Sequence, residues 1–178
     1  MMGNWLWVIG SRRKLLNKKI VVLVISSLAL LLLVPVAKSQ AVMVELSLEQ
    51  LVKEANLIVV GTVESVRSEL VEGKIFSFAT ILVSETIKGG LEQGENKIVV
   101  RFAGGNVGDI GMRVDNGPDY KVGENVVAFL KRAPGQSHYA TVGSFQGKFL
   151  VKDNVIVREN LSLDEFIGKV KKIMESNN

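Results

Sequence analysis

Residues 57–87 read LIVVGTVESVRSELVEGKIFSFATILVSETI, and this stretch decides the fold. Its first seven residues are mostly β-branched, which predicts a strand over residues 57–63, ahead of a charged stretch. Glu72 and Gly73 predict a turn, and residues 75–87 follow as a longer strand. Apolar side chains fall on both faces of that strand, with Phe76, Phe78 and Leu82 on one and Ile75, Ala79, Ile81 and Val83 on the other. The longer strand is therefore expected to be central or curled.

Further strands are predicted downstream of this stretch. Residues 97–102, 126–130 and 139–142 are apolar segments separated by glycine-containing connections, and Ala133-Pro134-Gly135 ends the second of them. Residues 149–151 and 155–157 flank Asp153-Asn154, a pair suited to a tight turn with positive φ, which predicts a closing hairpin.

A helix is predicted on each side of the strands. Ser47 and Gln50 have the spacing of a capping box, and a one-sided apolar stripe follows them. Ser162 and Glu165 repeat that spacing before a longer stripe, formed by Leu163, Phe166, Ile167, Val170, Ile173 and Met174. The second helix is therefore amphipathic, and both helices are expected to cover barrel openings or edge strands.

The predicted fold is mainly β. Five or six strands with short connections favour a small OB-like antiparallel β-barrel, with a flanking N-terminal helix and a C-terminal amphipathic helix. Residues 42–178 are expected to form this single domain, as a soluble monomer, preceded by one hydrophobic signal or anchor helix in residues 1–41.

The leader indicates export. Five basic residues between Arg12 and Lys19 precede an unbroken apolar run over residues 20–36, which as a helix would span roughly 25 Å. Small residues at Ala37, Ser39 and Ala41 fit a signal-peptidase site, so the leader is either a cleaved signal peptide or a retained membrane anchor. A buried core helix is a third alternative. The basic flank predicts an extracytoplasmic location for the rest of the chain, secreted or anchored to the cytoplasmic membrane.

Two further features bear on the export route. Residues 11–16, Ser-Arg-Arg-Lys-Leu-Leu, resemble the twin-arginine export motif, and ordinary basic n-region composition is the alternative. The chain has no cysteine, which excludes lipoprotein attachment.

Charge and composition exclude several function classes. The formal charge of +4 belongs to the leader, because residues 42–178 hold 16 Lys and Arg against 18 Asp and Glu, a net charge of −2. Nucleic acid is therefore not an expected partner. With no cysteine and one histidine, thiol nucleophiles, iron–sulfur clusters and the usual zinc sites are excluded, and we expect no cofactor.

The candidate binding segment is the stretch 104–123, in which six of twenty residues are glycine. Exposed backbone amides beside a few charged side chains could bind a peptide, an anion or a calcium ion. The candidate binding residues are Gly104, Gly105, Asn106, Asp109, Arg113, Asp115 and Asp119. The structural alternative is a lid over the barrel mouth, with Val107, Ile110, Met112 and Val114 packing downward.

The sequence gives little support for calcium binding, phosphate binding or serine-hydrolase chemistry. The carboxylates of residues 104–123 lack the spacing of an EF-hand, and no helix pattern follows the glycines to present an N-terminus to a phosphate. His138 is expected at the surface, and Ser137 beside it would point to the opposite face of a strand, which argues against a serine hydrolase. We therefore predict no catalytic residue.

The order of motifs resembles a group of uncharacterised exported prokaryotic β-barrel proteins. The resemblance is carried by residues 47–63, Gly104-Gly105, Val114, Gly117-Pro118, Gly123-Glu124 and Phe129-Leu130. Tyr120-x-x-Gly123-Glu124 ahead of residues 127–130 is distantly similar to netrin-like modules and tissue inhibitors of metalloproteinases, which implies an OB fold. Those inhibitors act through an N-terminal cysteine, so their mechanism does not carry over to this chain.

Together these features predict a non-catalytic, extracytoplasmic binding module. Its expected partner is an envelope or extracellular protein, a peptide or another ligand, bound through the glycine-rich loop and a barrel face. The alternative is an extracytoplasmic hydrolase that uses scattered carboxylates. The two differ in whether Asp109, Asp115, Asp119 and Glu124 converge in a pocket.

Overall fold

The computed structural model describes residues 44–92 and 94–176. Within these ranges no helix is both long enough and apolar enough to cross a membrane. The predicted signal or anchor helix, its apolar run 20–36 and its cleavage sites lie outside the described residues.

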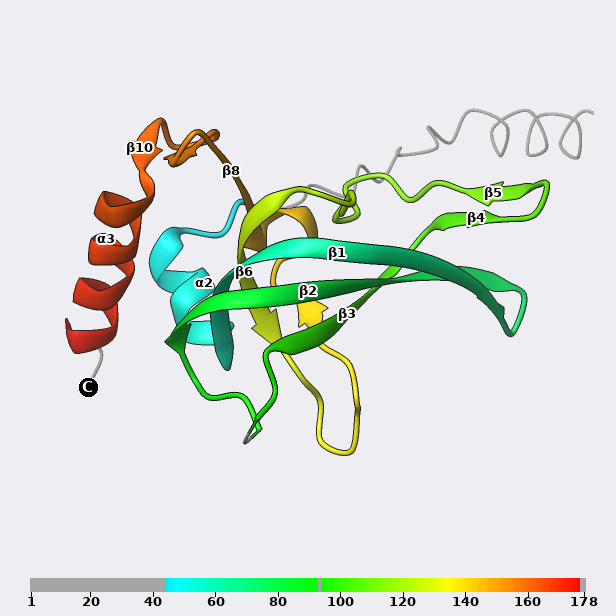
Figure 1. The fold of residues 1–178 in the computed structure, drawn as a ribbon, viewed down its shortest axis with the longest axis horizontal. Helices are drawn as coiled ribbons and strands as arrows, with labels where there is room; N and C mark the ends of the chain where they lie inside the picture. Colours follow the sequence, from blue (N-terminus) through cyan, green and yellow to red (C-terminus); the bar gives the residue numbers. More distant parts are fainter. Residues whose placement is uncertain (1–43, 93, 177–178) are drawn as a thin grey trace, which may run out of the picture. The chain divides into compact units, whose positions relative to one another are not determined.

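The described chain is mainly β, as predicted, with one helix before the strands in sequence and one after them, and both helices lie near the same end of the long strands (Figure 1). Helix α2 (Leu48–Glu54) leads into the long strands β1 (Leu57–Val71) and β2 (Lys74–Lys88), followed by β3 (Lys97–Ala103) and a small hairpin of β4 (Gly105–Val107) and β5 (Ile110–Met112). Strands β6 (Asn125–Lys131) and β7 (Ala140–Thr141) precede the short 3-10 helix η1 (Ser144–Gly147). The chain ends with β8 (Lys148–Lys152), β9 (Val155–Ile156), β10 (Leu161–Ser162) and helix α3 (Leu163–Ser176).

The main sheet is antiparallel, in the order β10-β9-β8-β6-β1-β2-β3, with β7 paired to β6. Strand β2 is central, as predicted, because β1 and β3 pair on its two sides. Its predicted faces are also confirmed, since Ile75, Ala79 and Ile81 are buried while Leu82 is 38% exposed.

The β1–β2 hairpin is longer than the sequence pattern predicts. We expected β1 to stop near Val63, whereas it continues through the charged stretch to Val71. Strand β2 pairs with it along this whole length, out to Val71 opposite Lys74, and the charged side chains project into solvent. The hairpin therefore extends beyond the helices, and β4 and β5 lie near its far end (Figure 1).

A short parallel contact joins β3 to the segment before β7. The backbone N–H of Tyr139 donates to the carbonyl of Val99, and the N–H of Arg101 donates to the carbonyl of Tyr139, both at 2.8 Å. Immediately afterwards Thr141 pairs with Leu130 of β6. This segment therefore lies between β3 and β6.

Hydrophobic clusters occupy both faces of the central strands. Leu57 and Val59 of β1 belong to one cluster, and Ile58 and Val60 belong to the other. This division follows from the alternation of side chains along a strand. Because residues 57–60 are apolar on both faces, this first part of β1 is buried on both sides.

Helices α2 and α3 cover one of these clusters. Phe166 of α3 packs against Phe129 of β6 and Phe149 of β8, with ring centroids 6.3 and 4.7 Å away. We expected the helices at barrel openings or edge strands. Helix α3 does contact the edge strand β10 and its neighbour β9, and the cluster that it shares with α2 also includes residues of central β1 and β6. This face of β1 and β6 is apolar, and the two helices bury it.

The predicted local signals are present. Ser47 and Gln50 form the capping box of α2, and Ser162 and Glu165 exchange the same pair of hydrogen bonds at the start of α3. Asp153 and Asn154 both have positive φ, at 50° and 61°, in the turn between β8 and β9. The short-range rules therefore located the caps and this hairpin correctly.

Candidate functional site

A groove of about 1180 Å³ lies between the glycine-rich loop and one face of the β1–β2 hairpin. Val66, Ser68 and Ser77 form the hairpin side, and residues 102–106 and 111–121 form the rest. We refer to this feature as the glycine-loop groove.

Six of the seven candidate binding residues line the glycine-loop groove. They are Gly104, Gly105, Asn106, Arg113, Asp115 and Asp119. Asp109 lies in the turn between β4 and β5 and is not among the lining residues. The structure thus brings together most of a set chosen from composition alone.

Two serine hydroxyls hold the loop against the hairpin. The Ser77 hydroxyl is buried and donates a hydrogen bond of 2.6 Å to the carbonyl of Gly104. Its oxygen is also 2.8 Å from the Ser68 hydroxyl oxygen, and because Ser77 has used its only proton, Ser68 is the donor there. The start of the loop is therefore fixed by side chains of both long strands.

Gly105 is required where the loop meets these serines. Its φ of +129° is a conformation that side chains rarely adopt, and an added Cβ would collide with both serine oxygens. Glycine therefore allows the backbone to approach the hairpin closely at the edge of the groove.

Tyr120 anchors the other end of the loop. Its side chain is 2% exposed, its hydroxyl lies 2.9 Å from that of Thr141, and its ring packs on Phe102. Burial raises the pKa of Tyr120 far above its ordinary value, so the phenol remains protonated. Tyr120 therefore serves as an anchor in the wall of the groove.

The Gly123-Glu124 motif has a structural role. Gly123 takes a φ of +86° and donates to the carbonyl of Val63 at 2.8 Å. The Glu124 carboxylate accepts from the backbone N–H of Lys121 and from the ammonium of Lys148, at 3.0 and 2.6 Å. These contacts direct the chain from the loop into β6.

The loop is not packed as the lid hypothesis requires. That hypothesis expected four apolar residues of the loop to pack downward. Val107 and Met112 are half-buried, but Ile110 and Val114 are 62% and 41% exposed. The reason is that β4 and β5 pair with each other near the end of the long hairpin, so Ile110 lies over no hydrophobic cluster. Arg113, Asp115 and Asp119 are also exposed.

The carboxylates proposed for a hydrolase do not converge. Asp115 and Asp119 line the groove, Asp109 lies outside it, and Glu124 is paired with Lys148. Across the described ranges no three His, Cys, Asp or Glu residues come together as a metal could require. His138 packs edge-on against Phe78, and burial together with the nearby Arg101 lowers its pKa.

Sequence reasoning missed the hairpin wall of the groove. Ser68 and Ser77 are far from the loop in sequence, and only the pairing of the long strands brings them to Gly104. One signal was present, because Ser77 interrupts the apolar face formed by Ile75, Ala79 and Ile81. A serine at such a position needs a hydrogen-bond partner.

No family model matches this chain, and no curated protein matches it either. Its function is therefore argued from the geometry of the glycine-loop groove.

Proposed function

We propose that the chain is a non-catalytic binding module that holds an extended segment of a protein partner in the glycine-loop groove. The observation that carries this proposal is the groove itself, a cavity of about 1180 Å³ that six candidate binding residues line. It exceeds the roughly 300–1,000 Å³ of ordinary small-molecule pockets.

The chemistry of the groove suits a peptide. Gly105, Gly111 and Gly117 add no side chains to the lining, so a bound main chain can approach closely, while Phe102 and Met112 offer apolar surface. Exposed charges of both signs, on Arg113, Asp115 and Asp119, can select the side chains of the partner.

The proposed scaffold is an OB-like closed barrel. Backbone pairing can be followed from β3 through Tyr139 and β7 to β6, then through β1 and β2 back to β3. The cluster containing Val59, Val100 and Ala128 would fill the interior of such a barrel. Closure would hold β3, which leads into the loop, at a constant position relative to β6, which follows it.

The proposed location is extracytoplasmic. The basic residues before the apolar run 20–36 favour a cytoplasmic N-terminus, which places residues after 41 outside. A fusion of residues 1–41 to a reporter that is active only outside the cytoplasm should be active. Activity confined to the cytoplasm would contradict this.

Selection from a displayed random-peptide library tests the binding function. The chain should enrich related peptides, and an Arg113→Ala/Asp115→Ala variant should lose them. Asp109→Ala is the matched control, since this exposed residue of the same loop does not line the groove and should retain binding. Enrichment that is identical for both variants would show that the groove is not the site.

A further inference from the structure

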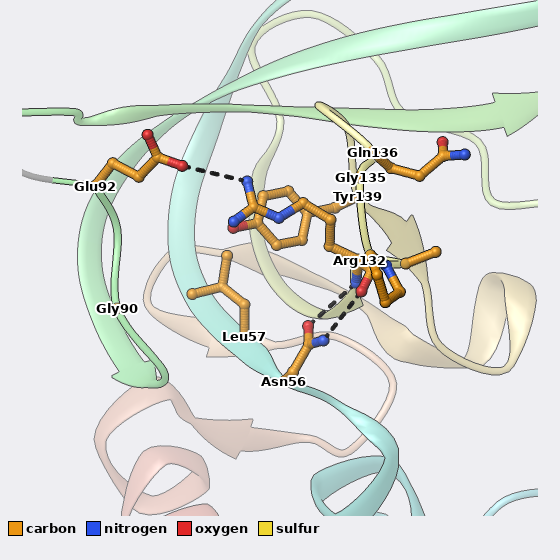
Figure 2. Close-up of a pocket in the computed structure, with 10 residues that line it drawn as sticks. Asn56, Leu57, Gly90, Glu92, Arg132, Gly135, Gln136 and Tyr139 are labelled. Atoms are coloured by element: carbon orange, nitrogen blue, oxygen red, sulfur yellow. Dashed lines mark hydrogen bonds and ion pairs between the residues drawn. The ribbon is translucent and has the colours of Figure 1, made fainter.

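A smaller pocket of about 480 Å³ lies apart from the glycine-loop groove and shares no lining residue with it. It forms where the start of β1, the connection after β2 and the loop between β6 and β7 meet. Figure 2 shows the side chains of Arg132 and Tyr139 at its centre, with Glu92 across from them.

Arg132 is held in position from two sides. Its backbone N–H donates to the side-chain oxygen of Asn56, and the Asn56 amide donates back to its carbonyl, at 3.2 and 3.3 Å. Its guanidinium lies 4.9 Å from the centre of the Tyr139 ring (Figure 2). Tyr139 is itself bound through its backbone to Val99 and Arg101. The cation is therefore pre-organised at the pocket.

The guanidinium of Arg132 retains donors for a ligand. Among the described residues its acidic partner is Glu92, at 3.7 Å, which is beyond hydrogen-bond distance. The Glu92 side chain is 71% exposed, so solvent weakens this pair. A ligand carboxylate could therefore displace Glu92 and accept two parallel hydrogen bonds from Arg132.

The rest of the pocket provides apolar walls and open space. Leu57 and Tyr139 are 2% and 8% exposed, and Pro134 also lines the pocket. Gly135 has a φ of +76°, and the turn that contains it is closed by a hydrogen bond from the Gln136 N–H to the Ala133 carbonyl. The space beside two glycines of the lining is open, since a Cβ at Gly90 or Gly135 would meet no atom within 4 Å. The volume is within the range of small-molecule sites.

We propose that this pocket binds a small organic acid, with its carboxylate on Arg132 and a planar or apolar body against Tyr139 and Leu57. A singly charged carboxylate suits the site better than a phosphate because Glu92 lies close to the same cation. The acid is either a free small molecule or the C-terminus of a peptide, since both present this group.

Ligand-observed NMR with the full chain in nanodiscs tests the proposal, with protein-free nanodiscs as the blank. Benzoate should bind, whereas benzamide, which has the same shape without the charge, should bind at least about tenfold more weakly. N-acetylphenylalanine and its amide repeat the comparison for a peptide terminus. If only benzoate binds, the ligand is a free acid; if N-acetylphenylalanine binds as well, peptide C-termini are included.

Three variants locate the binding. Arg132→Gln should weaken benzoate binding at least about tenfold, and Gly90→Leu should abolish it by filling the pocket. Arg67→Gln is the matched control, because Arg67 also lies over an aromatic ring, that of Phe78, but lines neither pocket. Absence of benzoate binding, equal binding of benzamide, or unchanged binding in Arg132→Gln would each overturn the proposal.

Discussion

The buried hydroxyl of Ser77 donates a hydrogen bond of 2.6 Å to the carbonyl oxygen of Gly104, 27 residues further along the chain. This contact connects the long hairpin to the start of the glycine-rich loop. The Gly104 N–H also donates to the carbonyl of Ile75 at 2.9 Å, so both backbone groups of Gly104 are bonded to β2 at the wall of the glycine-loop groove.

Replacing Ser77 by Ala should destabilise the fold. The substitution leaves the Gly104 carbonyl and the Ser68 hydroxyl without their partner, at a cost of about 1–3 kcal/mol. Urea unfolding measures the change in the free energy of unfolding. A cost close to zero would mean that water satisfies both groups equally well.

Gly105→Ala should be more harmful than Gly108→Ala. Both glycines have positive φ, so each substitution carries a backbone cost of roughly 1–2 kcal/mol. At Gly105 the added methyl also collides with the two serine oxygens, which adds about 1–3 kcal/mol, whereas Gly108 has open space around it. Thermal unfolding of both variants makes the comparison. Equal melting temperatures would contradict the close approach at Gly105.

Phe166→Ala should lower the free energy of unfolding by about 3–5 kcal/mol, because the ring is 1% exposed and packs against Phe129 and Phe149. Ile110→Ala is the control. A buried lid would make it costly, but its 62% exposure predicts a change within about 0.5 kcal/mol. Denaturant midpoints of the two variants test this, and a large loss at Ile110 would restore the lid hypothesis.

Stability should fall as the pH decreases through the titration range of His138. Burial, and then repulsion from Arg101, lowers the pKa of His138 below its ordinary value of 6.5. The unfolded chain therefore binds a proton more readily, and the stabilisation present above pH 6.5 is lost as the pH falls towards the folded-state pKa. His138→Gln should flatten this part of the profile. An unchanged slope in that variant would assign the dependence to other groups.

The sequence predicted the strand faces and helix starts, which depend on short-range rules. Alternation located the faces of β2, and capping spacing located the starts of both helices. The far half of β1 was missed because its charged residues form a strand only through pairing with β2. The β4–β5 hairpin was missed because its three-residue strands are too short to show a period.

Only the loop side of the glycine-loop groove was predicted from the sequence. Glycine content and charge singled out the loop and, with it, Arg113 and Asp115 of the groove. Ser68, Ser77 and the whole Arg132 pocket were missed, since each is assembled from segments that are distant in sequence. Asp109, predicted to bind together with Arg113 and Asp115, does not line the groove, because a pattern does not reveal which side of a turn faces a groove.

Photo-crosslinking in intact cells tests the central claim most directly. A photoreactive residue is introduced in turn at Arg113, which lines the glycine-loop groove, and at Lys152 of β8, which does not. A crosslinked partner peptide should be recovered from position 113 and not from position 152, and Gly105→Ala should reduce its yield. Equal recovery from both positions, or recovery from position 152 alone, would contradict binding in the groove.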